Sequence, residues 1–115
     1  MKELNIGGMT VAYNVVETIV SIAAKEVEGV EAVGMPGPGG LLGKISSGAT
    51  SSGVEIAVDD EDKLRIAIRV DVDYGYPLPQ LADKVREAIA DAVAMQLGLQ
   101  VSSIDVYIDG IQFNK

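Results

Sequence analysis

The sequence predicts an α+β fold with two layers, in which two helices pack on one face of a small mixed or antiparallel sheet. Two segments, residues 14–28 and 79–97, repeat apolar residues at helical spacing and are apolar on one side only. Three segments, 54–59, 64–74 and 104–109, alternate apolar and polar residues, as strands with one buried face do. One-sided helices and one-sided strands bury their apolar surfaces against each other, which leaves the other face of the sheet in water.

The first helix is expected over residues 14–28. Asn14 and Glu17 have the spacing of a capping box at its start, and Gly29 is placed to end it in a left-handed conformation. Glu26 falls inside the apolar stripe, where an unpaired carboxylate is costly. We therefore expect a structural carboxylate that bends out to water or accepts hydrogen bonds from the backbone beyond Gly29, with a functional acid as the alternative.

Short strands are expected on either side of this helix, at residues 9–11 and 30–34. Residues 34–53 are rich in Gly, Pro and Ser, which predicts a flexible loop that is either disordered or used for contact through Leu41, Leu42 and Ile45.

The glycines of this loop do not match the sequence motifs of phosphate-binding loops. Gly43-Lys44 is followed by Ile45 instead of Ser or Thr, and Pro38 stands where the first glycine of a P-loop belongs. The dinucleotide-binding pattern fails as well, because Leu42 replaces its third glycine. No nucleotide cofactor is expected.

The segments 54–59 and 64–74 are expected to form an antiparallel hairpin. If Asp59 pairs with Lys63, the even-numbered apolar residues of both strands lie on one face. The acidic turn between them lacks the ligand spacing of an EF-hand calcium loop, so we expect a solvated turn.

The second helix is expected from about Pro79 to Leu97, with proline in its first turn and Gly98 after its end. Its apolar stripe consists of Leu78, Leu81, Val85, Ala88, Ile89, Ala92 and Met95. If the final strand, 104–109, runs parallel to 64–74, the helix between them makes a right-handed crossover.

The polar face of the predicted strands carries charges of both signs: Arg65, Arg69, Asp71, Asp73, Asp105 and Asp109. Paired carboxylates can perform acid–base chemistry or hold a metal, but arginines on the same face can form cross-strand ion pairs with them. We therefore expect an exposed surface of mixed charge, with partner binding or a catalytic or metal site as alternatives. The candidate partner-binding surface consists of Arg65, Arg69, Asp71 and Tyr107, together with Leu41 and Leu42 of the loop.

The composition excludes several chemistries. The 115 residues include 17 Asp and Glu against 9 Lys and Arg, a net charge of −8, and contain no His or Cys. Disulfides, tetrahedral zinc sites of nitrogen and sulfur ligands, and nucleophiles that depend on His are therefore excluded. The acidic balance disfavours nucleic acid and direct adhesion to an anionic bilayer. With no signal peptide or membrane-spanning segment in the sequence, we expect a cytoplasmic protein.

Three segments together carry a resemblance to a known family: residues 15–30, Tyr74-Gly75-Tyr76-Pro77-Leu78-Pro79, and Ile104 through Phe113. Their order and spacing resemble the alkaline shock protein family, the Gls-type envelope stress response proteins of bacteria, from about Met9 to Phe113. Two features depart from that pattern. Ala12-Tyr13 stands where the family often has Ser-Pro or Ala-Pro, and the middle loop is richer in Gly, Pro and Ser.

The resemblance implies a single domain, residues 1–115, that is non-enzymatic and has neither catalytic residues nor cofactor. It implies a homo-oligomer that acts as a scaffold, and in some members recruitment beneath the membrane by a membrane-anchored protein partner. A KH-like nucleic-acid-binding module is the alternative, because helix–strand–strand–helix–strand order can resemble one. Gly37, Gly40 and Gly43 offer only a glycine spacing for its GXXG loop, beside a single Lys. A carboxylate-dependent enzyme or a metal-binding protein is the third possibility.

Overall fold

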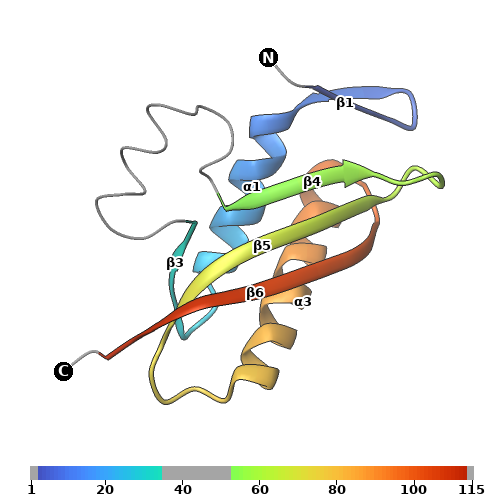
Figure 1. Ribbon diagram of the computed structural model, residues 1–115. Helices are drawn as coiled ribbons and strands as arrows, with labels where there is room; N and C mark the ends of the chain where they lie inside the picture. The colour runs from blue at the N-terminus through green and yellow to red at the C-terminus, as the bar shows by residue number, and fades with distance from the viewer. Residues whose placement is uncertain (1–2, 35–52, 114–115) are drawn as a thin grey trace.

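The computed structural model describes residues 3–34 and 53–113. Both helices lie on one face of the larger sheet, and a separate hairpin projects beyond the start of the first helix (Figure 1). The two-layer α+β fold is therefore confirmed. The elements in chain order are β1 (Glu3–Ile6), β2 (Met9–Ala12), α1 (Tyr13–Lys25), β3 (Val30–Val33), β4 (Val54–Val58), β5 (Leu64–Asp73), α3 (Leu78–Leu97) and β6 (Val101–Gln112).

The larger sheet is built on β5. β6 runs parallel to it along one edge, whereas β4 and then β3 run antiparallel along the other, opposite residues 64–68 and 70–72 respectively. β4 and β3 meet at Arg69, whose carbonyl accepts the N–H of Gly34 (3.0 Å) and whose N–H donates to the carbonyl of Gly53 (2.8 Å). A Cβ on Gly53 would lie 2.3 Å from the Cα of Gly34, so only glycine fits at residue 53.

The helix α1 is shorter than predicted at its C-terminal end. Its N-cap is Ala12, in an extended conformation without a side-chain cap, so the predicted capping box of Asn14 and Glu17 is wrong. Glu26 is the C-cap of the helix. A turn follows, which is closed by a hydrogen bond from the N–H of Val30 to the carbonyl of Val27 (3.1 Å). This turn leads the chain into β3, which confirms the short strand predicted after the helix.

The helix α3 confirms the second predicted helix almost residue for residue. Pro79 lies in its first turn, and Gly98 ends it in the left-handed region with φ +69°. Leu81, Val85 and Ile89 are buried as predicted. Met95, placed in the apolar stripe by the sequence, is instead 84% exposed, and the buried residue of that turn is Val93, further round the helix.

The hairpin of β4 and β5 has the predicted register. The N–H of Asp59 donates to the carbonyl of Lys63 (2.8 Å), and the even-numbered side chains of both strands face the helices. Asp59 also accepts the N–H of Lys63 at its carboxylate (3.0 Å), and this bond, more than any other contact, holds the pKa of Asp59 below its ordinary value.

Two strands differ from the sequence prediction. β6 extends beyond the predicted 104–109 at both ends and contains two shifts of register against β5, one near Ser102 and one near Asp109. β1 was not predicted, and it pairs with β2, the strand expected at residues 9–11, in a hairpin of its own.

Candidate functional site

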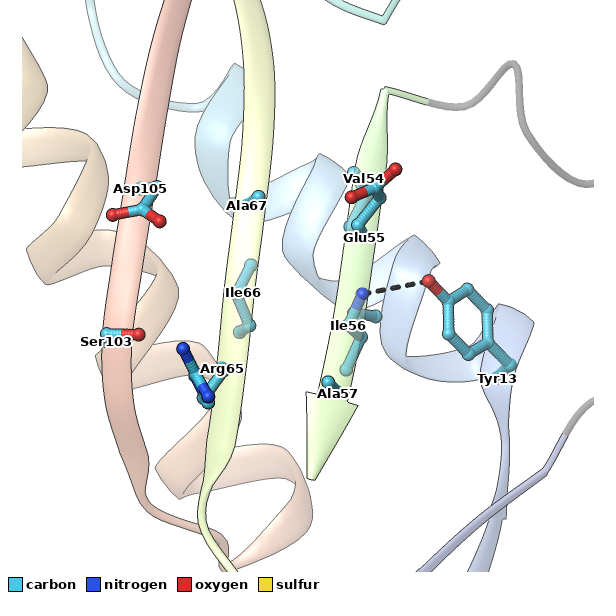
Figure 2. A pocket seen from close by; sticks show the side chains of 10 residues that line it. All are labelled: Tyr13, Val54, Glu55, Ile56, Ala57, Arg65, Ile66, Ala67, Ser103 and Asp105. Atoms are coloured by element: carbon cyan, nitrogen blue, oxygen red, sulfur yellow. Dashed lines mark hydrogen bonds between the residues drawn. The ribbon is translucent and has the colours of Figure 1, made fainter. Parts of the chain in front are cut away.

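The face of the larger sheet that points away from the helices is called the open face here. Most of its side chains come from three strands: Glu55 and Ala57 of β4, Arg65, Ala67, Arg69, Asp71 and Asp73 of β5, and Ser103, Asp105, Tyr107 and Asp109 of β6. The fourth strand, β3, contributes Ala32, which lies opposite Asp71. Part of this face is hollowed, with a volume of about 410 Å³, and the ring of Tyr13 stands at its β4 side (Figure 2). No described helix or strand covers this face.

The hydroxyl of Tyr13 completes the β4 side of the hollow. It accepts the backbone N–H of Ile56 (2.8 Å), a donor on the edge of β4 that faces away from β5. Burial raises the pKa of Tyr13, the nearby Glu17 and Glu55 act in the same direction, and the hydrogen bond from Ile56 opposes them. The phenol therefore stays protonated at neutral pH and satisfies an edge donor that would otherwise need water.

The hollow brings together charges of opposite sign from all three strands. Arg65 lies opposite Ala57 of β4 and Ser103 of β6 (Figure 2). Glu55 and Asp105 line the same hollow and flank Ala67, the next open-face residue along β5. Because Arg65, Glu55 and Asp105 are exposed, their mutual attraction is screened by water and contributes little to folding. These groups remain able to form charge-assisted hydrogen bonds with a molecule that displaces the water.

A second cluster on the open face is held more firmly. The guanidinium of Arg69 donates to both carboxylate oxygens of Asp109, at 3.0 and 3.2 Å, and lies 5.4 Å from the ring centroid of Tyr107. The cross-strand ion pair expected for Arg69 is therefore present. Tyr107 itself is 50% exposed, so the cluster presents an oriented cation and an aromatic ring to solvent.

The exposure expected for Asp71 is wrong, because this side chain is only 1% exposed. The register shift in β6 brings Gly110 opposite Asp71, and a Cβ at residue 110 would lie 2.8 Å from Oδ1 of Asp71. Gln112 Nε2 donates to Oδ2 (3.2 Å), whereas Oδ1 has no hydrogen-bond partner among the described residues. A glycine inside a strand pattern is a signal for such a bulge and close approach, and it could have identified this site.

An aromatic group at one end of the sheet was also missed. The rings of Tyr74 and Phe113 lie 4.8 Å apart between centroids, and both side chains are about two-thirds exposed. Tyr74 also lines a second hollow, of about 420 Å³, together with Tyr76 and Ile111. Tyr76 donates to Glu28 at 3.3 Å. The aromatic residues of the Tyr74–Pro79 turn and the last strand were the available signal.

A third hollow, of about 580 Å³, lies between α1 and α3. Ile22 of α1 and Ala88 and Ala92 of α3 line it, and Glu26 lies at its wall with an exposed side chain. The remaining candidate residues, Leu41 and Leu42, lie outside the described residues, as do residues 35–52 of the loop that contains them.

The open face does not gather the groups that a metal site needs. Among residues 3–34 and 53–113, no three acidic side chains come close enough to hold an ion. Neither helix in these ranges is long and apolar enough to cross a membrane.

Comparison with known proteins identifies relatives over nearly the whole chain. The sequence profile of the alkaline shock protein family, described as having a cell envelope-related function, matches residues 1–113. The uncharacterized protein YqhY of Bacillus subtilis (strain 168) is 28% identical over 113 residues, which cover 98% of this chain and 83% of the relative. The uncharacterized protein Spy1535 of Streptococcus pyogenes serotype M6 is 24% identical over 110 residues, covering 96% and 83%.

Solved structures show a likeness of fold only. One variant of the MamM CTD has a TM-score of 0.50 at 18% identity, over 84% of this chain and 95% of that chain. A second variant also has a TM-score of 0.50, at 17% identity, over 85% and 98% of the two chains.

Proposed function

Because this chain belongs to the alkaline shock protein family, whose function is related to the cell envelope, we propose that it is a non-enzymatic scaffold of the envelope stress response. In this proposal the protein self-associates and binds protein partners through the open face of its sheet. One of these partners is a membrane-anchored protein, which holds this cytoplasmic chain close to the membrane.

The observation that carries the proposal is the composition of the open face. Interfaces between proteins are enriched in Arg and Tyr, and such residues contribute most when their positions are fixed before binding. Arg69 is fixed in this way by its contacts with Asp109 and Tyr107. Arg65, on the same strand, lines the hollow of the open face. A partner that filled the hollow would remove water from groups of both charges and gain hydrogen bonds from them.

The distribution of charge favours a protein partner over a nucleic acid. Phosphates bind to faces where basic residues dominate. On the open face, however, Arg65 shares its hollow with Glu55 and Asp105, and Arg69 is already paired with Asp109. A protein surface of mixed charge is the better complement.

The placement of the acidic residues also supports a non-enzymatic role. Acid–base chemistry requires carboxylates that reach one reacting atom. The carboxylate of Asp71 is buried close to Gly110. The charge of Asp109 is neutralised by its ion pair with Arg69. Asp105 lines the same hollow as Arg65. These groups act as charged contacts rather than as a catalytic pair.

Attachment to the membrane is proposed to depend on protein because the charge of −8 is repelled by an anionic leaflet. An oligomer that presents many copies of a weak contact can gain about 10²- to 10⁴-fold in avidity. Self-association and attachment through an anchor protein therefore support each other.

The proposal is tested by affinity capture from the native host with two variants of equal charge change. Arg65→Glu alters the open face, whereas Lys84→Glu alters an exposed residue of α3 in the other layer. We expect partners, including a membrane protein, to be captured by the wild type and by Lys84→Glu but to be lost with Arg65→Glu. Equal capture by both variants would contradict the open face as the binding surface.

A second measurement tests the route to the membrane. Purified protein is mixed with protein-free anionic vesicles, and we expect it to stay in the supernatant at physiological salt. Tight binding to these vesicles that weakens with salt would contradict attachment through a protein.

A further inference from the structure

The strand β6 has one edge without a described partner. It spans Val101–Gln112 and bonds to β5 along one edge, and no strand within residues 3–34 or 53–113 pairs with the other. An edge of this length presents a row of backbone donors and acceptors that can pair with another chain. The opposite edge of the sheet is different, because Tyr13 already occupies the N–H of Ile56 on β4.

One side chain shows which backbone groups of β6 face outward. Arg86 of α3 donates from Nε to the carbonyl of Ile104 (3.1 Å), so this carbonyl points away from β5. Backbone direction alternates along a strand, which places the N–H and carbonyl groups of Val106 and Ile108 on the same outer edge. The register shifts near Ser102 and Asp109 bound this regular stretch.

We propose that this stretch pairs antiparallel with the same stretch of a second copy, about a two-fold axis at Val106, to form one continuous sheet. The inference rests on the proposed self-association and supplies the surface for it. Val106 then lies opposite Val106 of the second copy, and Ile104 lies opposite Ile108. β-Branched side chains in such opposite positions stabilise a pair of strands.

The acidic residues of β6 select this register over its neighbours. An axis at Tyr107 would place Asp105 of each copy opposite Asp109 of the other, and an axis at Asp105 would place that residue opposite itself. Like charges directly opposite each other destabilise a pair of strands. With the axis at Val106, Asp105 lies opposite Tyr107, and Ser103 lies opposite Asp109. No like charges then face each other on the open face.

The pairing requires one exchange of partners. With the axis at Val106, the carbonyl of Ile104 accepts the N–H of Ile108 from the second copy in place of the guanidinium of Arg86. Arg86 is 44% exposed at its side chain and also bonds Asp83 (2.7 Å), so it can release Ile104 and remain paired.

The register is tested by two variants that place either a positive or a negative charge at residue 107. Tyr107→Lys places a cation opposite Asp105 of the second copy, whereas Tyr107→Asp places two carboxylates opposite each other. Because each dimer contains this pair twice, we expect sedimentation equilibrium to show dimerisation strengthened by Lys and weakened by Asp, each by about 2- to 30-fold. Weakening by both variants would indicate an axis at Tyr107 and overturn the proposed register.

Cysteine cross-linking tests the contact directly, because the chain contains no Cys. Asp105 and Tyr107 form the closely spaced, non-hydrogen-bonded pair of the proposed register, in which a disulfide can form. We expect a mixture of Asp105→Cys and Tyr107→Cys proteins to form the mixed disulfide dimer on mild oxidation. Ala57→Cys, on the open face at the other side of the sheet, is the control and should not cross-link to Tyr107→Cys.

The outcomes separate this inference from the proposed function. If the wild type self-associates but the mixed disulfide is absent and the Tyr107 variants have no effect, the β6 contact is wrong and self-association uses another surface. If the wild type remains monomeric at all concentrations, both the β6 contact and the proposed self-association are wrong.

Discussion

The two faces of β5 differ in what decides the position of each side chain. Toward the helices, Leu64, Ile66, Ile68, Val70 and Val72 are at most 2% exposed. Toward the open face, Arg65 and Arg69 reach solvent, but Asp71, two residues further along, does not. On the helix-facing side, every second residue of β5 is buried. On the open face, the burial of a side chain depends on its register with the neighbouring strand.

The two faces also differ in how freely their residues can take part in binding. The helix-facing side is fixed by burial of apolar surface and has little freedom to change. The open face is arranged by individual pairs such as Arg69 with Asp109, which contribute little to stability and can exchange their partners.

Ile66 and Arg65 are adjacent in sequence and lie on opposite faces, so they provide the strongest test. Ile66→Asp buries a carboxylate without a partner, at a cost of several kcal/mol, comparable with a typical total stability of about 5–15 kcal/mol. Arg65→Asp should change the free energy of unfolding by less than about 1 kcal/mol. Urea titration followed by circular dichroism measures both, and equal tolerance of the two substitutions would mean that the faces are assigned wrongly.

Gly110→Ala tests the packing of β6 over Asp71. The added methyl group meets the buried carboxylate, so we expect a loss of about 1–3 kcal/mol in the free energy of unfolding. The loss should shrink in the Asp71→Ala background, because the group that clashes has been removed. A double-mutant cycle provides the measurement, and an equal cost in both backgrounds would show that Gly110 is required for another reason.

Tyr13→Phe tests the protected edge of β4. Loss of the hydroxyl leaves the N–H of Ile56 without its acceptor, and we expect a cost of about 1 kcal/mol. Tyr107→Phe, which changes a half-exposed ring, is the control and should cost less. A larger cost for the control would contradict the role of the Tyr13 hydroxyl.

The same hydroxyl predicts a dependence on alkaline pH. Because burial raises the pKa of Tyr13 in the folded state above the ordinary value of 10.0, the unfolded state loses its proton first. The stabilisation is complete below about pH 10 and is lost as the pH rises through the raised pKa. Stability measured between pH 8 and pH 12 should therefore fall less steeply in Tyr13→Phe, and identical slopes for the two proteins would refute the linkage.

Arg69→Ala should have the smallest effect on folding. Its ion pair with Asp109 is partly exposed, so we expect a change of about 0.2–1 kcal/mol in the free energy of unfolding. Capture of partners should nevertheless fall, because an oriented cation has been removed from the open face. A large loss of stability would show that this pair supports the fold rather than binding.

The sequence predicts best those elements whose pattern repeats several times. The alternation of β5 and the helical period of α3 identify both elements and most of their buried residues, because each additional repeat reinforces the same face. β1 has only four residues, which are too few for a periodic pattern to reveal a strand. The start of α1 was misplaced, because Asn14 and Glu17 match a capping spacing that the extended Ala12 does not use.

The repeating pattern of the strands also predicts part of the candidate site. Alternation alone places Arg65, Arg69 and Tyr107 on the open face, where the structure also has them, and their role in binding stays a prediction. Burial of Asp71 depends on a register shift between β5 and β6, which alternation within one strand cannot reveal. Gly110 was the single local sign of it.

Thiol labelling of two matched variants tests whether a partner covers the open face in the cell, as we propose. Ala57→Cys lies on the open face and Ala94→Cys on α3, both at exposed alanines of a chain without other cysteines. Each variant is labelled with a maleimide in purified form and in intact membrane-associated complexes from the native host. We expect equal labelling of the two purified proteins and protection of Ala57→Cys alone in the complexes. Equal labelling of both variants in the complexes, or protection of Ala94→Cys alone, would contradict the claim.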